Sequence, residues 1–191
     1  MTFILISGES NVGKTTVCNK LHDRIAADLS FTMHKKQDNL QHADKSDFFT
    51  YYEKGGKNIV LNTPSDSDSS MIETCQYLDS LAQSGMRPDI IITTIREADN
   101  ISKRAYPMSR MLALLDAIGK GTKNLESHFN QNIASITSFT PTSLVHHAFV
   151  LYLEKQANGK TEYDTKMILD RYWNYKAETA KQMLDLALAR L

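Results

Sequence analysis

The feature that most constrains the fold is a glycine-containing segment between a short apolar run and a helical pattern. Residues 3–6 are apolar without interruption, which is typical of a buried strand. After residue 14, four apolar residues recur at intervals of four, a spacing that places them on one helix face. They are Val17, Leu21, Ile25 and Leu29. The sequence therefore predicts a strand, a tight loop and a helix in immediate succession.

The connecting segment, GESNVGKT, matches the pattern G-x-x-x-x-G-K-[ST] in full. Its glycines let the backbone turn and direct amides at phosphate oxygens, and the following helix adds the partial positive charge of its N-terminus. Lys14 is the expected catalytic residue, because it would neutralise the β- and γ-phosphates. Thr15 is expected to hold Mg²⁺ through its hydroxyl, and Thr16 to donate to the α-phosphate.

The expected ligand is therefore ATP with Mg²⁺, although nothing in the sequence distinguishes ATP from GTP. The predicted nucleotide-binding residues are Gly8, Glu9, Ser10, Asn11, Val12, Gly13, Lys14, Thr15 and Thr16.

Strand and helix patterns alternate along the rest of the chain. The predicted strands are residues 31–34, 58–62, 89–95 and 132–139, and the predicted helices are residues 70–84, 107–118, 143–156 and 163–191. Ser70 and Glu73 fit a capping box at the start of one of these helices. The alternation predicts a single domain, residues 1–191, with a three-layer α/β/α architecture and a mainly parallel sheet.

Two segments allow more than one interpretation. Residues 44–54 fit a helix, which we favour, or a hairpin strand that turns at Gly55 and Gly56. The terminal helix carries an apolar stripe that is expected to dock on its own domain, with a homodimer interface as the alternative. The stripe comprises Ile168, Tyr172, Tyr175, Thr179, Met183 and Leu186.

Charge and composition narrow the class of protein. Lys plus Arg and Asp plus Glu are equal at 22 each, so the formal charge is zero and there is no strong nucleic-acid signal. Cys18 and Cys75 lie far apart and are expected to be buried, reduced thiols. No signal peptide or membrane-span pattern is present, so a cytoplasmic, soluble chain is expected.

The strand, loop and helix at the start of the chain resemble those of P-loop NTPases, and the resemblance implies that fold for most of the chain. The stretch NIVLNTPSDSD is similar to the strand ending in Asp-Thr-Pro of the ParA/MinD-like branch, which includes partition and plasmid-stability ATPases. Here Asn62 replaces the acid, so Asp66 becomes the candidate Mg²⁺ carboxylate. The alternative is that Asp66 and Asp68 only begin the next helix. That branch commonly has a lysine where this chain has Glu9, so a lysine contact across a dimer is not implied.

The expected activity is slow, Mg²⁺-dependent ATP hydrolysis that controls the interaction with a protein partner. A kinase that transfers the γ-phosphate to a small molecule or nucleotide is the first alternative, because cations follow the strand at residues 89–95. The candidate phosphate or acceptor contacts are Arg96, Arg104 and Arg110. A nucleotide switch without hydrolysis is the second alternative, since Asn62 supplies no charge.

Overall fold

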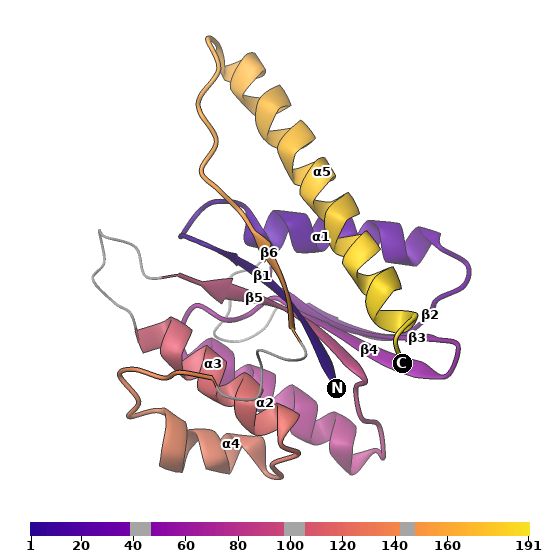
Figure 1. The fold of residues 1–191 in the computed structure, drawn as a ribbon, viewed down its shortest axis with the longest axis vertical. Coiled ribbons are helices and arrows are strands. Elements are labelled where there is room, and N and C mark those ends of the chain that lie inside the picture. Colours follow the sequence, from indigo (N-terminus) through magenta and orange to yellow (C-terminus); the bar gives the residue numbers. More distant parts are fainter. Residues whose placement is uncertain (39–46, 98–105, 142–147) are drawn as a thin grey trace.

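A six-stranded sheet forms the centre of the molecule in the computed structural model, which describes residues 1–38, 47–97, 106–141 and 148–191 (Figure 1). The strands are β1 (Thr2–Gly8), β2 (Thr32–Asp38), β3 (Phe48–Lys54), β4 (Lys57–Asn62), β5 (Ile90–Arg96) and β6 (Ala148–Tyr152). Their order in space is β2-β3-β4-β5-β1-β6. β1 pairs in parallel with both β5 and β6, and β5 with β4, whereas β3 runs antiparallel to its two neighbours. The predicted mainly parallel sheet is confirmed.

Helices cover both faces of this sheet (Figure 1). On one face lie α1 (Lys14–Ala27) and α5 (Glu162–Leu188); on the other lie α2 (Asp68–Gln83), α3 (Tyr106–Gly119), the short α4 (Leu125–His128) and the π-helical turn η1 (Phe129–Ile133). Successive side chains of β1 point to opposite faces of the sheet. Ile4 and Ile6 pack with α1 and α5, whereas Phe3 and Leu5 pack with α2 and α3. The predicted three-layer α/β/α arrangement follows from these two cores.

The favoured helix over residues 44–54 is wrong for its described part. Residues 48–54 form β3, which turns into β4 at Gly55 and Gly56, whose φ angles are 58° and 74°. Two consecutive positive φ angles suit a two-residue hairpin turn, and glycine adopts them without the steric cost of a Cβ atom. β3 is buried on both faces, so its aromatic run lacks the alternation that marks a half-exposed strand. Residues 44–46 lie outside the described part.

Two further predictions in the second half of the chain are wrong. The expected strand at 132–139 is absent from that part of the structure; α4 and η1 occupy 125–133, and a loop follows. Within the expected helix at 143–156, residues 148–152 form β6 instead, and 142–147 lie outside the described residues. β6 has five residues, and its pairing with β1 across more than 140 positions is tertiary information that a local pattern lacks.

Helix boundaries also differ in detail. The cap of α2 is Ser67, whose hydroxyl accepts from the amide of Ser70, so the expected capping box at Ser70 and Glu73 is wrong. A capping box does begin α5, between Thr161 and Asp164. Helix α1 ends at Ala27, which leaves Leu29 fully exposed rather than on the helix face.

The buried stripe of α5 matches the expected one only in part, because Tyr172 and Met183 are partly buried against the core but the fully buried positions are different ones. The buried residues are Ala177, Ala180, Leu184 and Ala187, whereas Tyr175 and Leu186 are 67% and 53% exposed. Alanine side chains allow α5 to lie close against α1, and large apolar residues are left at the surface. Within the described ranges, none of the helices is both long enough and apolar enough to cross a membrane.

Candidate functional site

The loop between β1 and α1 has the backbone geometry that its glycines predict. Asn11 and Gly13 adopt left-handed conformations, with φ of 62° and 91°. A Cβ atom on Gly8 would lie 2.7 Å from the carbonyl oxygen of Leu153, which follows β6. Glycine at position 8 therefore permits the close approach of the segment after β6 to the loop.

Lys14 folds back over the loop. Its ammonium donates to the carbonyl oxygens of Gly8 at 3.0 Å and Glu9 at 2.8 Å, and the residue is only 7% exposed. Burial lowers the pKa of Lys14, and the nearby charge of Asp66 opposes that effect. The Lys14 ammonium thus lies over the loop. Phosphate oxygens bound there would replace the two carbonyls as its hydrogen-bond acceptors.

A carboxylate that the sequence analysis missed lies next to Thr15. The Thr15 hydroxyl donates to Asp47 Oδ1 at 3.4 Å, and the Thr63 hydroxyl donates to the same oxygen at 2.9 Å. Asp47 directly precedes β3 and Thr63 directly follows β4, so the antiparallel pairing of these strands brings both to the loop between β1 and α1. A hydroxyl and a carboxylate are ligands suited to Mg²⁺. The helix expected over residues 44–54 did not place Asp47 at the end of a strand, so Asp47 was not considered as a metal ligand.

Asp66, the expected Mg²⁺ carboxylate, is exposed and close enough for its charge to raise the pKa of Lys14. Its side chain makes no hydrogen bond to any described residue, including Thr15. Asp68 begins α2 and forms an ion pair with Arg110. Asp66 is therefore near the loop, whereas Asp68 is held at the start of its helix.

Asn62, which the sequence comparison placed where the ParA/MinD-like branch has an acid, is buried in a polar network. Its amide nitrogen donates to the Thr93 hydroxyl at 2.8 Å, and its amide oxygen accepts from the Thr74 hydroxyl at 3.1 Å. The residue is 1% exposed. Asn62 thus ties β4 to β5 and to α2, and its polar atoms are satisfied without a ligand.

The three candidate arginines have different surroundings. Arg96 ends β5 in register with Gly8, and its charge contributes to the lowered pKa of Lys14. Arg110 pairs with Asp68 and donates from Nε to the carbonyl oxygen of Ile136 at 3.1 Å. Arg104 lies outside the described residues. The structure therefore brings Arg96 to the loop and holds Arg110 at the start of α2.

Glu97 is a second carboxylate that the sequence analysis missed. It follows the last residue of β5, accepts from the Ser7 hydroxyl at 2.8 Å, and donates its amide to the Gly8 carbonyl at 3.1 Å. Its charge also raises the pKa of Tyr152, on the other strand that flanks β1. The signal in the sequence was its place two residues after the strongest apolar run, residues 89–95.

The chain's single tryptophan lies against the loop. The indole nitrogen of Trp173, in α5, donates to the Val12 carbonyl oxygen at 3.1 Å, and a Cβ atom on Gly13 would lie 2.1 Å from that nitrogen. The ion pairs Lys20–Asp170 and Arg24–Glu178 fasten α5 to α1 on either side of this contact. The terminal helix thus contacts the loop directly, which the sequence analysis did not anticipate.

Comparison with curated proteins and with solved structures gave no match. Among family models, one described as RNA helicase matches residues 4–86, a segment that runs from β1 past the end of α2 and contains the whole loop. The match covers less than half of the 191 residues, so it does not assign the chain to that family. Together with the fold, it supports a P-loop NTPase type of domain, with nucleotide binding as its general chemistry.

Proposed function

We propose that the chain binds ATP with Mg²⁺ at the Gly8–Thr15 loop and hydrolyses it slowly, under the control of a protein partner. One observation carries the proposal: the Lys14 ammonium rests on the carbonyls of Gly8 and Glu9, at the start of a helix and beside the Thr15–Asp47 pair. This arrangement concentrates positive charge where a triphosphate would lie.

Each group would have a distinct task. Lys14 would leave the loop carbonyls and bind the β- and γ-phosphate oxygens. The backbone amides of the loop and the N-terminus of α1 would hold the triphosphate. Thr15 and Asp47 would hold Mg²⁺, with Asp66 as the second carboxylate nearby. The ion supplies charge neutralisation for the transferred phosphoryl group.

Control by a partner is supported by the surface of α5. Tyr163, Ile168 and Tyr175 are 75%, 38% and 67% exposed on this helix, and Trp173 of the same helix contacts the loop. A change in the loop on nucleotide binding would therefore reach a helix that presents large apolar side chains to solvent. A second copy of the chain or another protein would bind there.

Transfer of the γ-phosphate to a small molecule is the second candidate, and the position of Arg96 favours it. This guanidinium is close enough to Lys14 to lower its pKa, so two cations lie at the carboxyl edge of β1 and β5. A switch that binds nucleotide without turnover is the third, since Asn62 is enclosed in its own network.

The test combines binding and turnover. Purified protein is titrated with ATP while the fluorescence of Trp173 is followed, and γ-labelled ATP with Mg²⁺ is then followed alone, with small metabolites and with single-stranded RNA. We expect Lys14→Ala to weaken binding at least about tenfold, because a charge-assisted contact to phosphate is lost.

Lys20→Ala is the matched control, because Lys20 lies on the same helix and pairs with Asp170. It should bind ATP like the unchanged protein. Equal affinity of the Lys14→Ala variant would contradict the phosphate-loop assignment. Label on a metabolite would identify a kinase, and label released as free phosphate would identify an ATPase. Binding of ATP without release or transfer of the label would identify a nucleotide switch. Faster hydrolysis with RNA would name the partner class that the family model suggests.

A further inference from the structure

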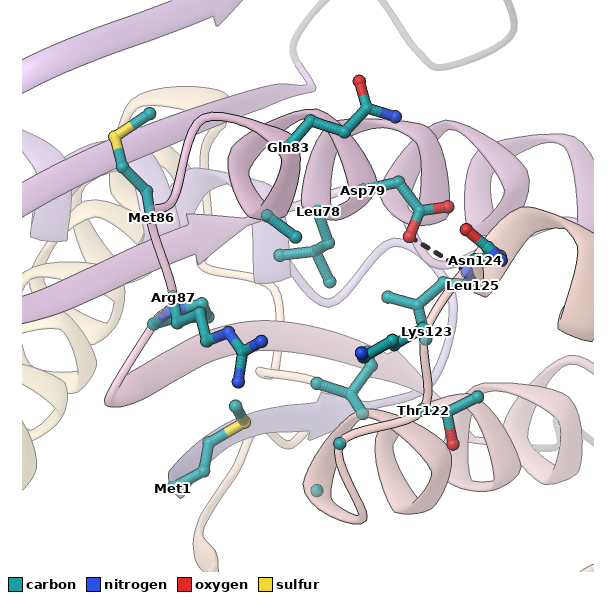
Figure 2. A pocket seen from close by; sticks show the side chains of 15 residues that line it. Met1, Leu78, Asp79, Gln83, Met86, Arg87, Thr122, Lys123, Asn124 and Leu125 are labelled. Carbon is teal, nitrogen blue, oxygen red and sulfur yellow. Dashed lines mark hydrogen bonds between the residues drawn. The ribbon is translucent and has the colours of Figure 1, made fainter.

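A cavity of about 430 Å³ opens near the amino-terminal ends of β1 and β5, away from the loop that follows β1 (Figure 2). The end of α2, the α2–β5 connection and the α3–α4 connection line it. Met1, which precedes β1, also lines it, whereas Gly8 at the other end of β1 belongs to the P-loop. A strand of this length spans about 20 Å. A molecule in the cavity would therefore be remote from the nucleotide.

The lining is apolar beneath and cationic at the rim. Leu78, Ile118 and Leu125 are each at most 6% exposed and form part of the core beneath the cavity. Arg87 and Lys123 are exposed, and Figure 2 shows their charged ends pointing toward one another across the opening. Neither side chain forms an ion pair or hydrogen bond with any described residue. Two like charges thus face each other, and neither has an ion-pair partner among the described residues.

Asp79 is the carboxylate in the lining, and its oxygens are already engaged. They accept from the amide of Leu125 at 2.9 Å, the bond dashed in Figure 2, and from the amide of Glu126 at 3.2 Å. These bonds hold the α3–α4 connection against α2 and build one wall of the cavity. Asp79 therefore shapes the cavity while keeping its negative charge, and it forms no ion pair with Arg87 or Lys123, which remain available to an external anion.

We propose that this cavity binds a small organic carboxylate with an apolar body. Arg87 presents a planar fork that matches the two oxygens of a carboxylate, and Lys123 adds a point charge from the opposite side. The apolar body would lie on Leu78, Met86 and Leu125. A volume of about 430 Å³ is within the range of small-molecule sites, in which a few polar groups orient a mainly apolar ligand.

The test uses the full chain with ¹³C-labelled methionine methyl groups, titrated with octanoate and followed by NMR. The Met86 signal should shift and saturate, while the signal of Met111, buried in the core and absent from the lining, should stay in place. Arg87→Gln and Lys123→Gln should each weaken binding about tenfold, as expected for loss of one charge-assisted contact. Octanamide, which has the same body without the charge, should be weaker by a similar factor.

Lys120→Gln is the matched control, because Lys120 is close in sequence to Lys123 but pairs with Asp116 and does not line the cavity. It should leave octanoate binding unchanged. Equal binding of octanamide, a Met86 shift that does not saturate, or undiminished binding by the Arg87→Gln/Lys123→Gln double variant would each overturn the proposal. Tighter binding of octyl phosphate would overturn the choice of a carboxylate. Lys14→Ala should bind octanoate normally, which separates this site from the nucleotide site.

Discussion

Asp47 and Asp66 are the two candidate carboxylates for a metal ion held by the Thr15 hydroxyl, and they differ in how they are positioned. Asp47 hydrogen-bonds Thr15 from 32 positions away in the chain and is oriented by Thr63, whereas Asp66 is exposed without a hydrogen-bond partner among the described residues. An oriented carboxylate loses less side-chain entropy on binding a cation than a free one does. The geometry therefore favours Asp47 as the stronger metal ligand.

We expect Asp47→Asn to lower Mg²⁺-dependent hydrolysis at least about tenfold while leaving metal-free ATP binding within about twofold, because one anionic ligand is lost and the loop is unchanged. Asp66→Asn should have a smaller effect. Hydrolysis is measured over a Mg²⁺ titration, with urea unfolding to check that both variants are folded. The reverse order of the two effects would return the role to Asp66.

Individual residues show which contacts a sequence pattern can contain and which it cannot. The contacts within the loop, such as those of Lys14 with Gly8 and Glu9, join residues that are close in the chain, so a short pattern covers them. Asp47 and Trp173 reach the loop only through strand pairing and helix packing, and Trp173 is 161 positions from Val12. The enclosure of Asn62 likewise depends on Thr74 and Thr93. A linear pattern contains none of these long-range contacts.

At the scale of elements, the sequence pattern predicts helix α5 but not the residues that the helix buries completely. Its length and approximate start are visible in the sequence. Its fully buried residues, however, are Ala177, Ala180, Leu184 and Ala187, and the larger Tyr172 and Met183 are only partly buried against the same core. Alanine is a weak signal of burial, since its side chain carries little apolar area. β3 was misassigned because it is buried on both faces and lacks the alternation of a half-exposed strand, and β6 because its pairing partner, β1, lies more than 140 positions away.

We expect Ala180→Leu to lower the free energy of unfolding by about 1–3 kcal/mol, because three added carbons must fit between α5 and the layer it covers. Gln182→Leu, an exposed position two residues later, is the control and should change it by less than about 0.5 kcal/mol. Urea unfolding of both variants measures the difference. An Ala180→Leu variant of unchanged stability would mean that α5 does not pack against α1 as closely as described.

At the scale of the molecule, a single sheet separates two cores, and each core contains one cysteine. Cys18 of α1 lies in the core shared with α5, and Cys75 of α2 lies in the core shared with α3. Burial raises the pKa of both thiols well above its ordinary value. Because the thiolate is the reactive form, neither thiol should react while its layer is closed.

If the chain is one cooperative domain, both layers should open together, because every β1 residue that faces one core adjoins residues that face the other. We therefore expect Cys18 and Cys75 to resist iodoacetamide in native buffer and to become labelled at the same urea concentration. Cys18→Ala and Cys75→Ala variants allow each thiol to be followed separately. Labelling of Cys18 at a distinctly lower concentration would show that α1 and α5 detach before the sheet unfolds, and would divide the molecule into two units of different stability.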